Sequence, residues 1–306
     1  MGQYRKILLI VDPNGEESPA FTRAVVLAKR SGATLLLGLF KERASRTPPD
    51  WLQQRIAQLK DQGIVAKRFV TYGGPLQRTI VDTILETRPD LVVKDRGDAP
   101  VLKRMTGTSL DAQLVRLCPA PLLLVTPSAQ ALPKRIIAAV DIVSGDERRA
   151  VNDRILKESM DLALQCDAQV AMAYAFDFLP MTPLPGGTVM QGGASSPVIE
   201  QVREERREEL FAFADAHSVP DDRRYFLDGS TEIAVARLAS DLRADIVTLG
   251  TNYRTGLDRL VFGSTAARML RRLQCDLLVV KPEGFEAELA AHLQRDAEAP
   301  LRHAAA

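Results

Sequence analysis

The chain has 306 residues, of which 46% are hydrophobic and 26% are charged, and its 40 Lys and Arg against 39 Asp and Glu leave a net charge of +1. This near-neutral balance argues against a generic polyanion binder, because affinity for a phosphate backbone needs a surplus of Lys and Arg on one face. At roughly 150 residues per domain, the length predicts two domains, each able to bury a core without disulfides or metals.

We expect neither a targeting signal nor a cysteine-based site in this sequence. No apolar run approaches the ~18 residues that a membrane span requires, and residues 1–6 lead directly into a strand-like segment without a signal peptide. We therefore expect a cytoplasmic protein with no membrane span and no nucleic-acid partner. Cys118, Cys166 and Cys275 are odd in number and lie outside any CxxC motif, which indicates neither a disulfide framework nor a zinc site.

Short apolar runs alternate with amphipathic segments along the first half. Residues 6–12 are a continuous apolar run that ends in Asp12, which is typical of a strand buried on both faces of a parallel sheet. Because parallel strands need right-handed crossovers, the alternation predicts an open α/β sheet with helices on both faces. The predicted strands are 6–12, 34–40, 67–71, 90–93 and 121–125, and the predicted helices are 19–29, 51–62, 76–87 and 109–117.

The same order of elements repeats in the second half. Residues 135–141 match residues 6–12 at an offset of 129, and the segment 272–280 matches 116–125 at an offset of about 155. A longer first helix at 148–165 and an insert at 176–197 rich in Pro and Gly account for the growth of the offset. The repeat predicts two copies of one α/β unit, followed by a tail that begins with a helix.

Ligands of doubly wound sheets bind outside the carboxyl ends of the strands, where the strand order reverses. In the second half the fourth strand runs into Gly250 and then Gly256, and Gly263, Ser264 and Thr265 open the next helix. We expect Gly250 to let the chain leave the strand at positive φ. Bare amides and two hydroxyls at a helix N-terminus favour phosphate, so this segment is a candidate triphosphate cradle.

These residues resemble the universal stress protein family, specifically its tandem E-type members, over residues 4–282. The family's nucleotide signature is Gly-x2-Gly-x9-Gly-(Ser/Thr), and Gly250, Tyr253 in place of the second glycine, and Gly263-Ser264 follow that spacing. The resemblance implies two tandem open five-stranded parallel sheets of the adenine-nucleotide α-hydrolase-like fold, with the flavodoxin-like strand order 3-2-1-4-5. The implied domains are 1–127 and 134–283, followed by a C-terminal tail at 284–306.

The resemblance also implies a nucleotide site in the second domain. Asp141 ends the first strand, where ATP-binding relatives contact adenosine, and Ala173 and Tyr174 lie on the second strand, which lines the base pocket. ATP, with Mg²⁺ alongside it, is the implied cofactor, and no catalytic residue or resident metal is implied. The implied cofactor-binding residues are Asp141, Ala173, Gly250, Arg254, Gly256, Gly263, Ser264 and Thr265.

Both halves depart from the family pattern. A side chain at Tyr253 opposes the close backbone approach that a glycine permits. In the first half, Asp95 and Asp98 stand where Gly250 and Tyr253 stand in the second. Two carboxylates repel a triphosphate, so we expect a degenerate site in the first half, with a solvated charged loop around Lys94 to Asp98.

No enzyme motif accompanies the candidate site. The sequence contains no Gly-x4-Gly-Lys-(Ser/Thr), no Gly-x-Gly-x-x-Gly after the first strand and no Gly-x-Ser-x-Gly. We expect a non-catalytic stress-response protein in which ATP is a regulatory ligand. The alternatives are a nucleotide-free scaffold of the same fold that binds a protein partner, a binder of another small ligand and, more weakly, a slow ATPase.

The resemblance further implies how the two copies meet. In single-domain relatives the fifth strands pair across a dimer. We therefore expect residues 122–125 and 277–280 to pair within this chain as an intramolecular pseudo-dimer, with a homodimer of the whole chain as a further arrangement.

Overall fold

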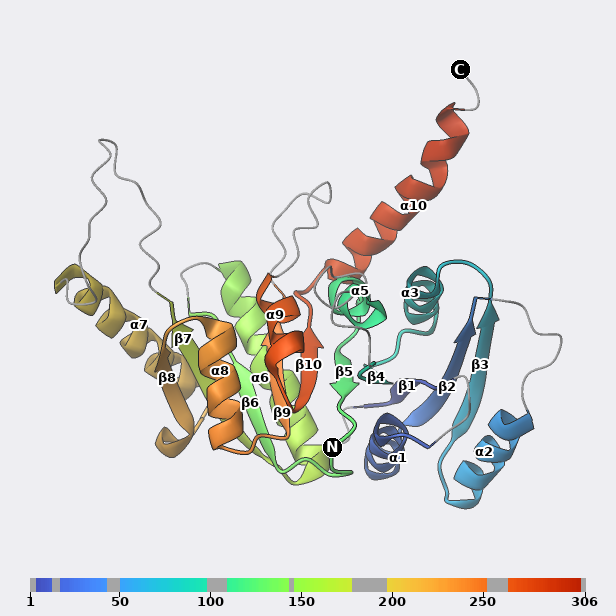
Figure 1. The fold of residues 1–306 in the computed structure, drawn as a ribbon, viewed down its shortest axis with the longest axis horizontal. Helices are drawn as coiled ribbons and strands as arrows, with labels where there is room; N and C mark the ends of the chain where they lie inside the picture. The colour runs from blue at the N-terminus through green and yellow to red at the C-terminus, as the bar shows by residue number, and fades with distance from the viewer. Residues whose placement is uncertain are drawn as a thin grey trace.

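The computed structural model describes residues 4–12, 17–42, 50–97, 109–142, 146–177, 197–251 and 264–303. These residues form one ten-stranded sheet in the order β3-β2-β1-β4-β5-β10-β9-β6-β7-β8. Neighbouring strands are parallel except β5 and β10, which are antiparallel. The predicted order 3-2-1-4-5 is therefore confirmed in both halves, which lie side by side and meet at β5 and β10 (Figure 1).

The first half alternates strands and helices as its apolar runs predict. Local sequence sets the ends of its first helix, α1: Ser18 accepts a hydrogen bond from the Phe21 amide, Pro19 occupies the first turn, and Gly32 ends the helix at φ 71°. The strands are β1 (Lys6–Ile10), β2 (Thr34–Lys41), β3 (Ala66–Tyr72), β4 (Leu91–Asp95) and β5 (Leu122–Val125). The helices are α1 (Pro19–Ser31), α2 (Asp50–Asp61), α3 (Leu76–Thr87) and α5 (Leu110–Leu117).

The second half repeats this order with a longer first helix, as predicted, and its tail begins with a helix, also as predicted. Its strands are β6 (Arg135–Ala139), β7 (Gln169–Phe176), β8 (Arg224–Asp228), β9 (Ile246–Gly250) and β10 (Asp276–Val280). Its helices are α6 (Asp146–Cys166), α7 (Pro197–Ala216), α8 (Thr231–Asp241), α9 (Ser264–Arg272) and α10 (Phe285–His303), with a 3-10 turn at Asp221–Arg223. No helix in the described ranges is both long enough and apolar enough to cross a membrane.

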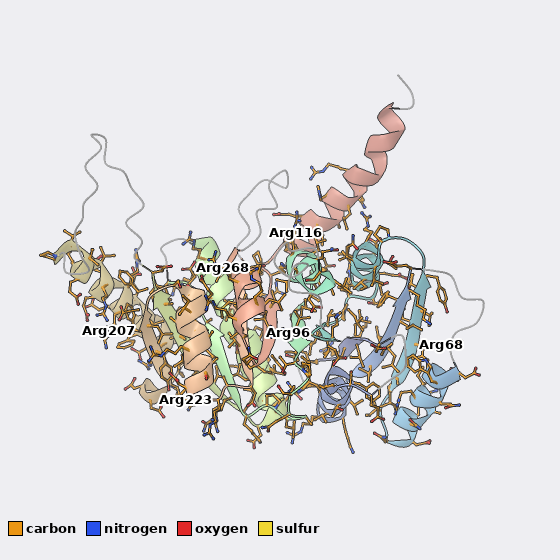
Figure 2. All side chains as sticks on the ribbon, in the orientation of Figure 1. Arg68, Arg96, Arg116, Arg207, Arg223 and Arg268 are labelled. Atoms are coloured by element: carbon orange, nitrogen blue, oxygen red, sulfur yellow. The ribbon has the colours of Figure 1, made fainter. Side chains whose placement is uncertain are left out.

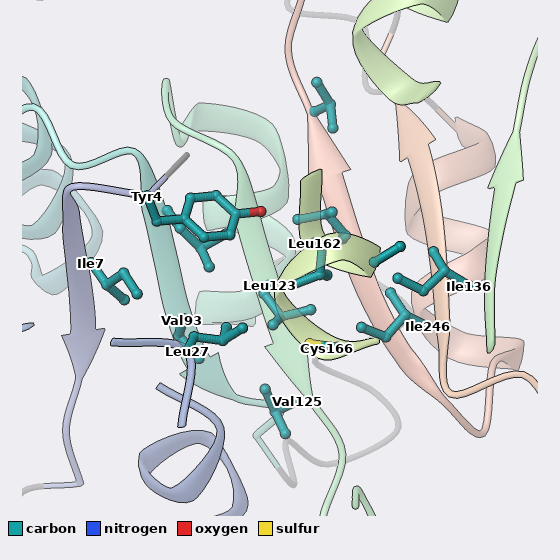
Figure 3. Close-up of a cluster of buried hydrophobic side chains, with 14 of the residues drawn as sticks. Tyr4, Ile7, Leu27, Val93, Leu123, Val125, Ile136, Leu162, Cys166 and Ile246 are labelled. Atoms are coloured by element: carbon teal, nitrogen blue, oxygen red, sulfur yellow. The ribbon is translucent and has the colours of Figure 1, made fainter. Parts of the chain in front are cut away.

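Two hydrophobic cores cover the two faces of the sheet, and each runs through both halves. Helices α1, α2, α6 and α7 pack on one face, where Leu27, Leu123 and Ile246 belong to one cluster (Figure 3). Helices α3, α5, α8 and α9 pack on the other face. Because neither core stops at the junction of the two halves, the halves bury apolar surface against each other as one unit.

The antiparallel pairing of β5 with β10, which we call the β5·β10 seam, joins the two halves. Leu277 is opposite Leu124 and Val279 is opposite Leu122. All residues of both strands are buried. The pairing of the fifth strands within one chain, which the family resemblance led us to expect, is therefore confirmed.

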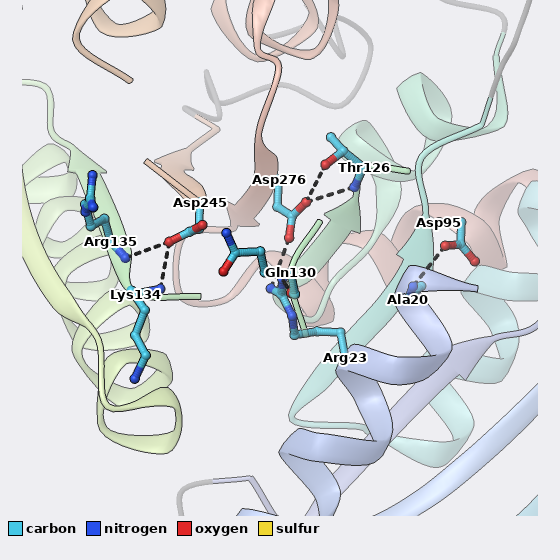
Figure 4. A network of polar contacts seen from close by, with 9 residues as sticks. All are labelled: Ala20, Arg23, Asp95, Thr126, Gln130, Lys134, Arg135, Asp245 and Asp276. Carbon is cyan, nitrogen blue, oxygen red and sulfur yellow. Dashed lines mark hydrogen bonds and ion pairs between the residues drawn. The ribbon is translucent and has the colours of Figure 1, made fainter. Parts of the chain in front are cut away.

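A buried polar network ties α1 of the first half to β10 of the second (Figure 4). Arg23 Nη1 lies 3.0 Å from Asp276 Oδ2, and each side chain is 1% exposed. The other oxygen, Asp276 Oδ1, accepts hydrogen bonds from the amide and hydroxyl of Thr126, at 2.8 and 3.0 Å. Charge-assisted hydrogen bonds of this kind have strict geometry, so the network fixes the position of the halves relative to each other.

Each half also supplies a cation to the C-terminus of a helix in the other half. Arg96, which follows β4, donates from Nη1 to Leu273 O at 2.8 Å and from Nη2 to Leu270 O, at the end of α9 (Figure 2). Lys281, which follows β10, donates from Nζ to Val115 O at 2.6 Å and Arg116 O at 2.8 Å, at the end of α5. Both cations satisfy carbonyls that a helix leaves without partners at its C-terminus.

Candidate functional site

The strand order reverses at β6, which has β7 on one side and β9 on the other. Ala139 of β6 is opposite Leu249 of β9, so Asp141 and Gly250 emerge at the same edge of the sheet. The structure thus brings two predicted site residues together where doubly wound sheets bind ligands. Three others, Arg254, Gly256 and Gly263, lie outside the described residues, as does Tyr253.

Asp141 is held by its main chain and presents its carboxylate to solvent. Its amide donates to Asn152 Oδ1 at 3.0 Å, and Asn152 Nδ2 donates back to Asp141 O at 3.0 Å. Its side chain is 47% exposed, with Arg148 Nη1 3.6 Å from Oδ2. The first turns of α6 therefore fix the backbone of Asp141 and leave its carboxylate accessible beside a guanidinium. Sequence analysis missed Arg148 and Asn152, which lie in the first two turns of the helix that follows Asp141.

Gly250 is a glycine for a different reason from the one we predicted. It is not among the described glycines with positive φ. A Cβ at this position would lie 2.4 Å from Val151 Cγ1 and 3.0 Å from Ile155 Cδ1, both on α6. The prediction of a positive φ is therefore wrong, and Gly250 instead allows α6 to pack close to the end of β9.

The start of α9 carries a cation that sequence analysis also missed. Arg268 Nη2 lies 3.5 Å from Thr265 Oγ1, and Arg268 Nε lies 3.0 Å from Glu232 Oε1 of α8. The first turn of α9 contains no acidic residue. A positive helix N-terminus with a guanidinium beside it and no acid in the first turn favours an anionic ligand. The signal available in the sequence was Arg268 itself, a basic residue four positions after Ser264, the first residue of α9.

Ala173 does not line an open surface. It is 0% exposed, belongs to the core beneath α8 and α9, and its carbonyl accepts a hydrogen bond from the Val140 amide at 2.9 Å. Tyr174, the next residue, packs its ring 5.6 Å from that of Phe226. Burial, and secondarily the charge of Asp141, raise the pKa of Tyr174 to about 12. Tyr174 is therefore a neutral aromatic side chain that senses the charge of Asp141, and at 7% exposed it is buried, as Ala173 is.

In the first half, a carboxylate of the protein itself occupies the N-terminus of α5, the counterpart of α9. Lys94 Nζ donates to Asp111 Oδ1 at 2.8 Å, and the Gly97 amide donates to Asp111 Oδ2 at 2.8 Å. The side chains of Lys94 and Asp111 are 13% and 5% exposed. Asp111 thus takes the cation and the amide that a phosphate oxygen would use.

The segment 94–97, which contains the end of β4 and the two residues after it, is not the solvated charged loop that we predicted. Asp95 Oδ1 accepts a hydrogen bond from the Ala20 amide at 2.9 Å and so serves the N-terminus of α1. Lys94 pairs with Asp111, and Arg96 reaches α9 across the seam. Residues 94–97 are all partly buried. The prediction is therefore wrong for these residues, while Asp98 lies outside the described residues.

The three cysteines are free, and two of them, Cys118 and Cys166, are buried. Burial raises the pKa of Cys118 to about 12 and that of Cys166 to about 11. Both are therefore thiols at neutral pH, and a thiol is a poor nucleophile compared with a thiolate. Within the described ranges, no three His, Cys, Asp or Glu side chains gather in a way that could hold a metal ion.

The universal stress protein family model matches the chain twice, over residues 3–126 and 133–281. The chain belongs to the universal stress protein family. It is 27% identical to Universal stress protein E of Salmonella typhi, with 94% of this chain and 97% of that protein covered. It is also 27% identical to the Universal stress protein E homolog of Haemophilus influenzae, with 92% and 98% covered.

Two solved structures share the fold over nearly the whole chain. A protein of Pseudomonas aeruginosa PAO1 described as functionally unknown superposes with a TM-score of 0.80 at 23% identity, covering 96% of this chain and 98% of its own. A universal stress protein from Archaeoglobus fulgidus superposes with a TM-score of 0.60 at 13% identity, covering 91% and 99%. At these identities the likeness concerns the fold, and the site rests on the residues described above.

Proposed function

We propose that this tandem universal stress protein binds an adenine nucleotide, ATP, in its second half and that the nucleotide is a regulatory ligand. The observation that carries the proposal is the contrast between the equivalent helix N-termini of the two halves. Asp111 occupies the N-terminus of α5 in the first half, whereas Arg268 stands beside an acid-free first turn of α9 in the second. Glu232 of α8 pairs with Arg268, but the first turn of α9 itself contains no acid, so a nucleotide would supply the negative charge at that helix N-terminus.

The donors and acceptors of the second half fit the two ends of a nucleotide. The exposed carboxylate of Asp141 is an acceptor for ribose hydroxyls, and Tyr174 offers an aromatic ring nearby. Ser264 and Thr265 open α9, and Gly263 precedes them in the sequence; amides and hydroxyls of these residues would hold phosphates with Mg²⁺ alongside. Gly250, Arg254 and Gly256 complete the loop in this proposal, and Ala173 is left out because it is fully buried.

A ligand at the start of α9 would act on the first half through the other end of that helix. The C-terminal carbonyls of α9 accept hydrogen bonds from Arg96 of the first half. The residues after α9 lead into β10, which forms the β5·β10 seam. We therefore propose that nucleotide binding biases how the halves meet, or how whole chains pair, during a cytoplasmic stress response, without turnover of the nucleotide.

The test measures nucleotide bound to the purified full chain and its affinity for ATP. Heat-denatured protein should release about one adenine nucleotide per chain, and added ATP should raise the melting temperature. Asp141→Asn and Thr265→Val should each weaken binding about tenfold, since each removes a polar contact worth roughly 1.4 kcal/mol. Asp12→Asn, the equivalent change in the first half, is the matched control and should bind ATP as the wild type does.

The second candidate is a nucleotide-free scaffold that presents the joined halves to a protein partner. It is favoured by the buried Ala173 and by the first half, whose own carboxylate replaces a ligand. No released nucleotide, together with no rise in melting temperature on adding ATP, would replace our proposal with this one. Release of ADP and phosphate in step with the chain concentration would instead indicate the slow ATPase.

A further inference from the structure

A cavity of about 250 Å³ lies between the two halves, and we call it the inter-half cavity. The first half contributes residues at the amino ends of its strands, Tyr4 before β1, Asp90 before β4 and Pro121 before β5, and the second half contributes α6 and the start of α10. None of the residues of the proposed nucleotide site lines it. Because both halves form its walls, a ligand here would bridge them.

Charged side chains dominate the lining, and most of them have partners. Arg88 Nε lies 3.4 Å from Glu286 Oε1, and Lys157 Nζ donates to Asp161 Oδ2 at 2.8 Å. Asp90 Oδ2 accepts the amides of Arg5 and Lys6 at 2.7 and 2.8 Å. Arg154 donates to the carbonyl of Lys281 at 2.8 Å. The four carboxylates of the lining are Asp90, Glu158, Asp161 and Glu286, against the three cations Arg88, Arg154 and Lys157.

Glu158 is the lining carboxylate that forms no ion pair or hydrogen bond with a described residue. It is 9% exposed and lines both the inter-half cavity and an adjoining space of about 520 Å³. Within the described part of the chain its carboxylate has neither a hydrogen bond nor an ion pair. Burial raises its pKa, while Lys157 and Arg154 act in the opposite direction. Its carboxylate oxygens are not among the enclosed polar atoms of the described residues, so they face the space of the cavity and are available to a ligand there.

Tyr4 adds a second buried polar group without a partner. The residue is 2% exposed, and its hydroxyl has no hydrogen bond to any described residue. Its ring lies beside β1 with the hydroxyl directed towards the second half, on the side of Leu162 (Figure 3). Burial, followed by the charges of Glu158 and Asp161, raises the pKa of Tyr4, so the hydroxyl stays protonated in a negative local field. Its oxygen is therefore an acceptor that nothing in the described protein uses.

We propose that the inter-half cavity binds a small organic cation whose primary ammonium or guanidinium group donates hydrogen bonds to Glu158 and to Tyr4 Oη. The excess of carboxylate disfavours an anion, and a neutral ligand would leave the charge of Glu158 uncompensated. The described residues provide no set of metal ligands here. At roughly 30 Å³ per water molecule, the cavity volume suits an aliphatic amine or alkylguanidine of several heavy atoms.

The test uses 1,4-diaminobutane and butylguanidinium as probes for the full chain, with neutral 1,4-butanediol for comparison. Isothermal titration should show saturable binding of at least one cation, with a matching rise in melting temperature, and no binding of the diol. Glu158→Gln should weaken the binding at least tenfold. The matched control is Asp82→Asn, which removes an exposed carboxylate of α3 that is paired with Arg78 and lies outside both cavities.

Two further readouts separate a ligand site from a structural role. Without ligand, Glu158→Gln and Tyr4→Phe should melt at the same temperature as the wild type or higher, since each removes a buried polar group that lacks a partner. Tyr4→Phe should also weaken binding of the cation severalfold, and ATP affinity should be unchanged in both variants. The proposal is overturned if neither cation binds, or if Glu158→Gln binds it as the wild type does.

Discussion

The N-termini of α5 and α9 occupy equivalent places in the two halves but have different electrostatic environments. Counting back five residues from the matching Arg116 and Arg272, Asp111 of the first half corresponds to Ala267 of the second. Asp111 accepts hydrogen bonds from Lys94 and from the Gly97 amide, whereas Leu249 stands in the place of Lys94. One copy of the fold thus holds its own anion at this helix end, whereas the other has Arg268, paired with Glu232, beside a first turn without an acid.

The two copies also use different residues for the same contact across the seam. The C-terminus of α9 is capped by Arg96, whose counterpart in the second half is Thr251. The C-terminus of α5 is capped by Lys281, whose counterpart in the first half is Thr126. Each helix C-terminus is therefore capped by a basic side chain from the other half, but Arg96 follows the fourth strand of its half whereas Lys281 follows the fifth strand of its own. The two halves therefore differ in sequence at positions where each of them contacts the other.

The largest effect is expected where the first half holds its internal anion. Asp111→Ala leaves the ammonium of Lys94 largely buried without its carboxylate, which should lower the free energy of unfolding by about 3 kcal/mol. Urea denaturation followed by circular dichroism measures it. The double variant Lys94→Met/Asp111→Ala should recover most of the loss, because it removes the unpaired charge. A loss below 1 kcal/mol for the single variant would mean that the ion pair is not the basis of the difference between the halves.

The next largest effect on stability concerns Lys281, which follows the last strand of the second half where the first half has Thr126. Burial lowers the pKa of Lys281 to about 7, so the unfolded chain binds more protons than the folded chain between pH 7 and the usual lysine pKa. The free energy of unfolding should therefore rise with pH across this window, by about 1 kcal/mol per pH unit. Urea denaturation at pH 7, 8 and 9 gives the free energy of unfolding of the wild type and of Lys281→Met, and the difference between the two proteins should change with pH at that rate. A difference that stays constant with pH would contradict the lowered pKa of Lys281.

A smaller loss of stability is expected from substitutions at Gly250, which ends β9, and at Asp95, which ends β4. Gly250→Ala puts a methyl group 2.4 Å from Val151 Cγ1 and should cost about 2 kcal/mol through overpacking against α6. In the first half, Asp95→Ala removes the acceptor of the Ala20 amide and should cost about 1 kcal/mol, as for other helix caps. Thermal melts of both variants test the order. Equal losses would indicate that the glycine is not needed for the packing of α6.

The smallest effect on stability is expected when the second half is given the helix-start carboxylate that the first half has. Ala267→Asp places a carboxylate near the start of α9, as Asp111 is at α5. An acid in the first turns of a helix is favourable, so the fold should keep its stability within about 0.5 kcal/mol. ATP affinity should fall about tenfold, because the new carboxylate competes with phosphate for Arg268 and the helix N-terminus. Titration of ATP into the variant measures this, and unchanged affinity would place the phosphates elsewhere.

The arrangement within each half followed from local patterns in the sequence. Apolar runs such as residues 6–12, together with helical spacing, predicted the strands and helices, and the internal repeat predicted the same strand order twice. The positions of candidate site residues such as Asp141 and Thr265 could be predicted, because strand ends and helix starts can be located from the pattern. Arg148 and Asn152 were missed because their roles depend on which face of α6 turns towards the end of β6.

The sequence by itself determined the family, the duplication and the order of the strands, since these depend on hydrophobic periodicity and on motifs that are close together along the chain. Only the tertiary structure decided that Gly250 serves helix packing, that Asp111 occupies the first helix N-terminus, and that Glu158 and Tyr4 face a cavity without partners. Contacts such as those of Lys281 join residues 166 positions apart. Steric fit and charge pairing at that separation arise from the packing of the two halves, and no local pattern encodes them.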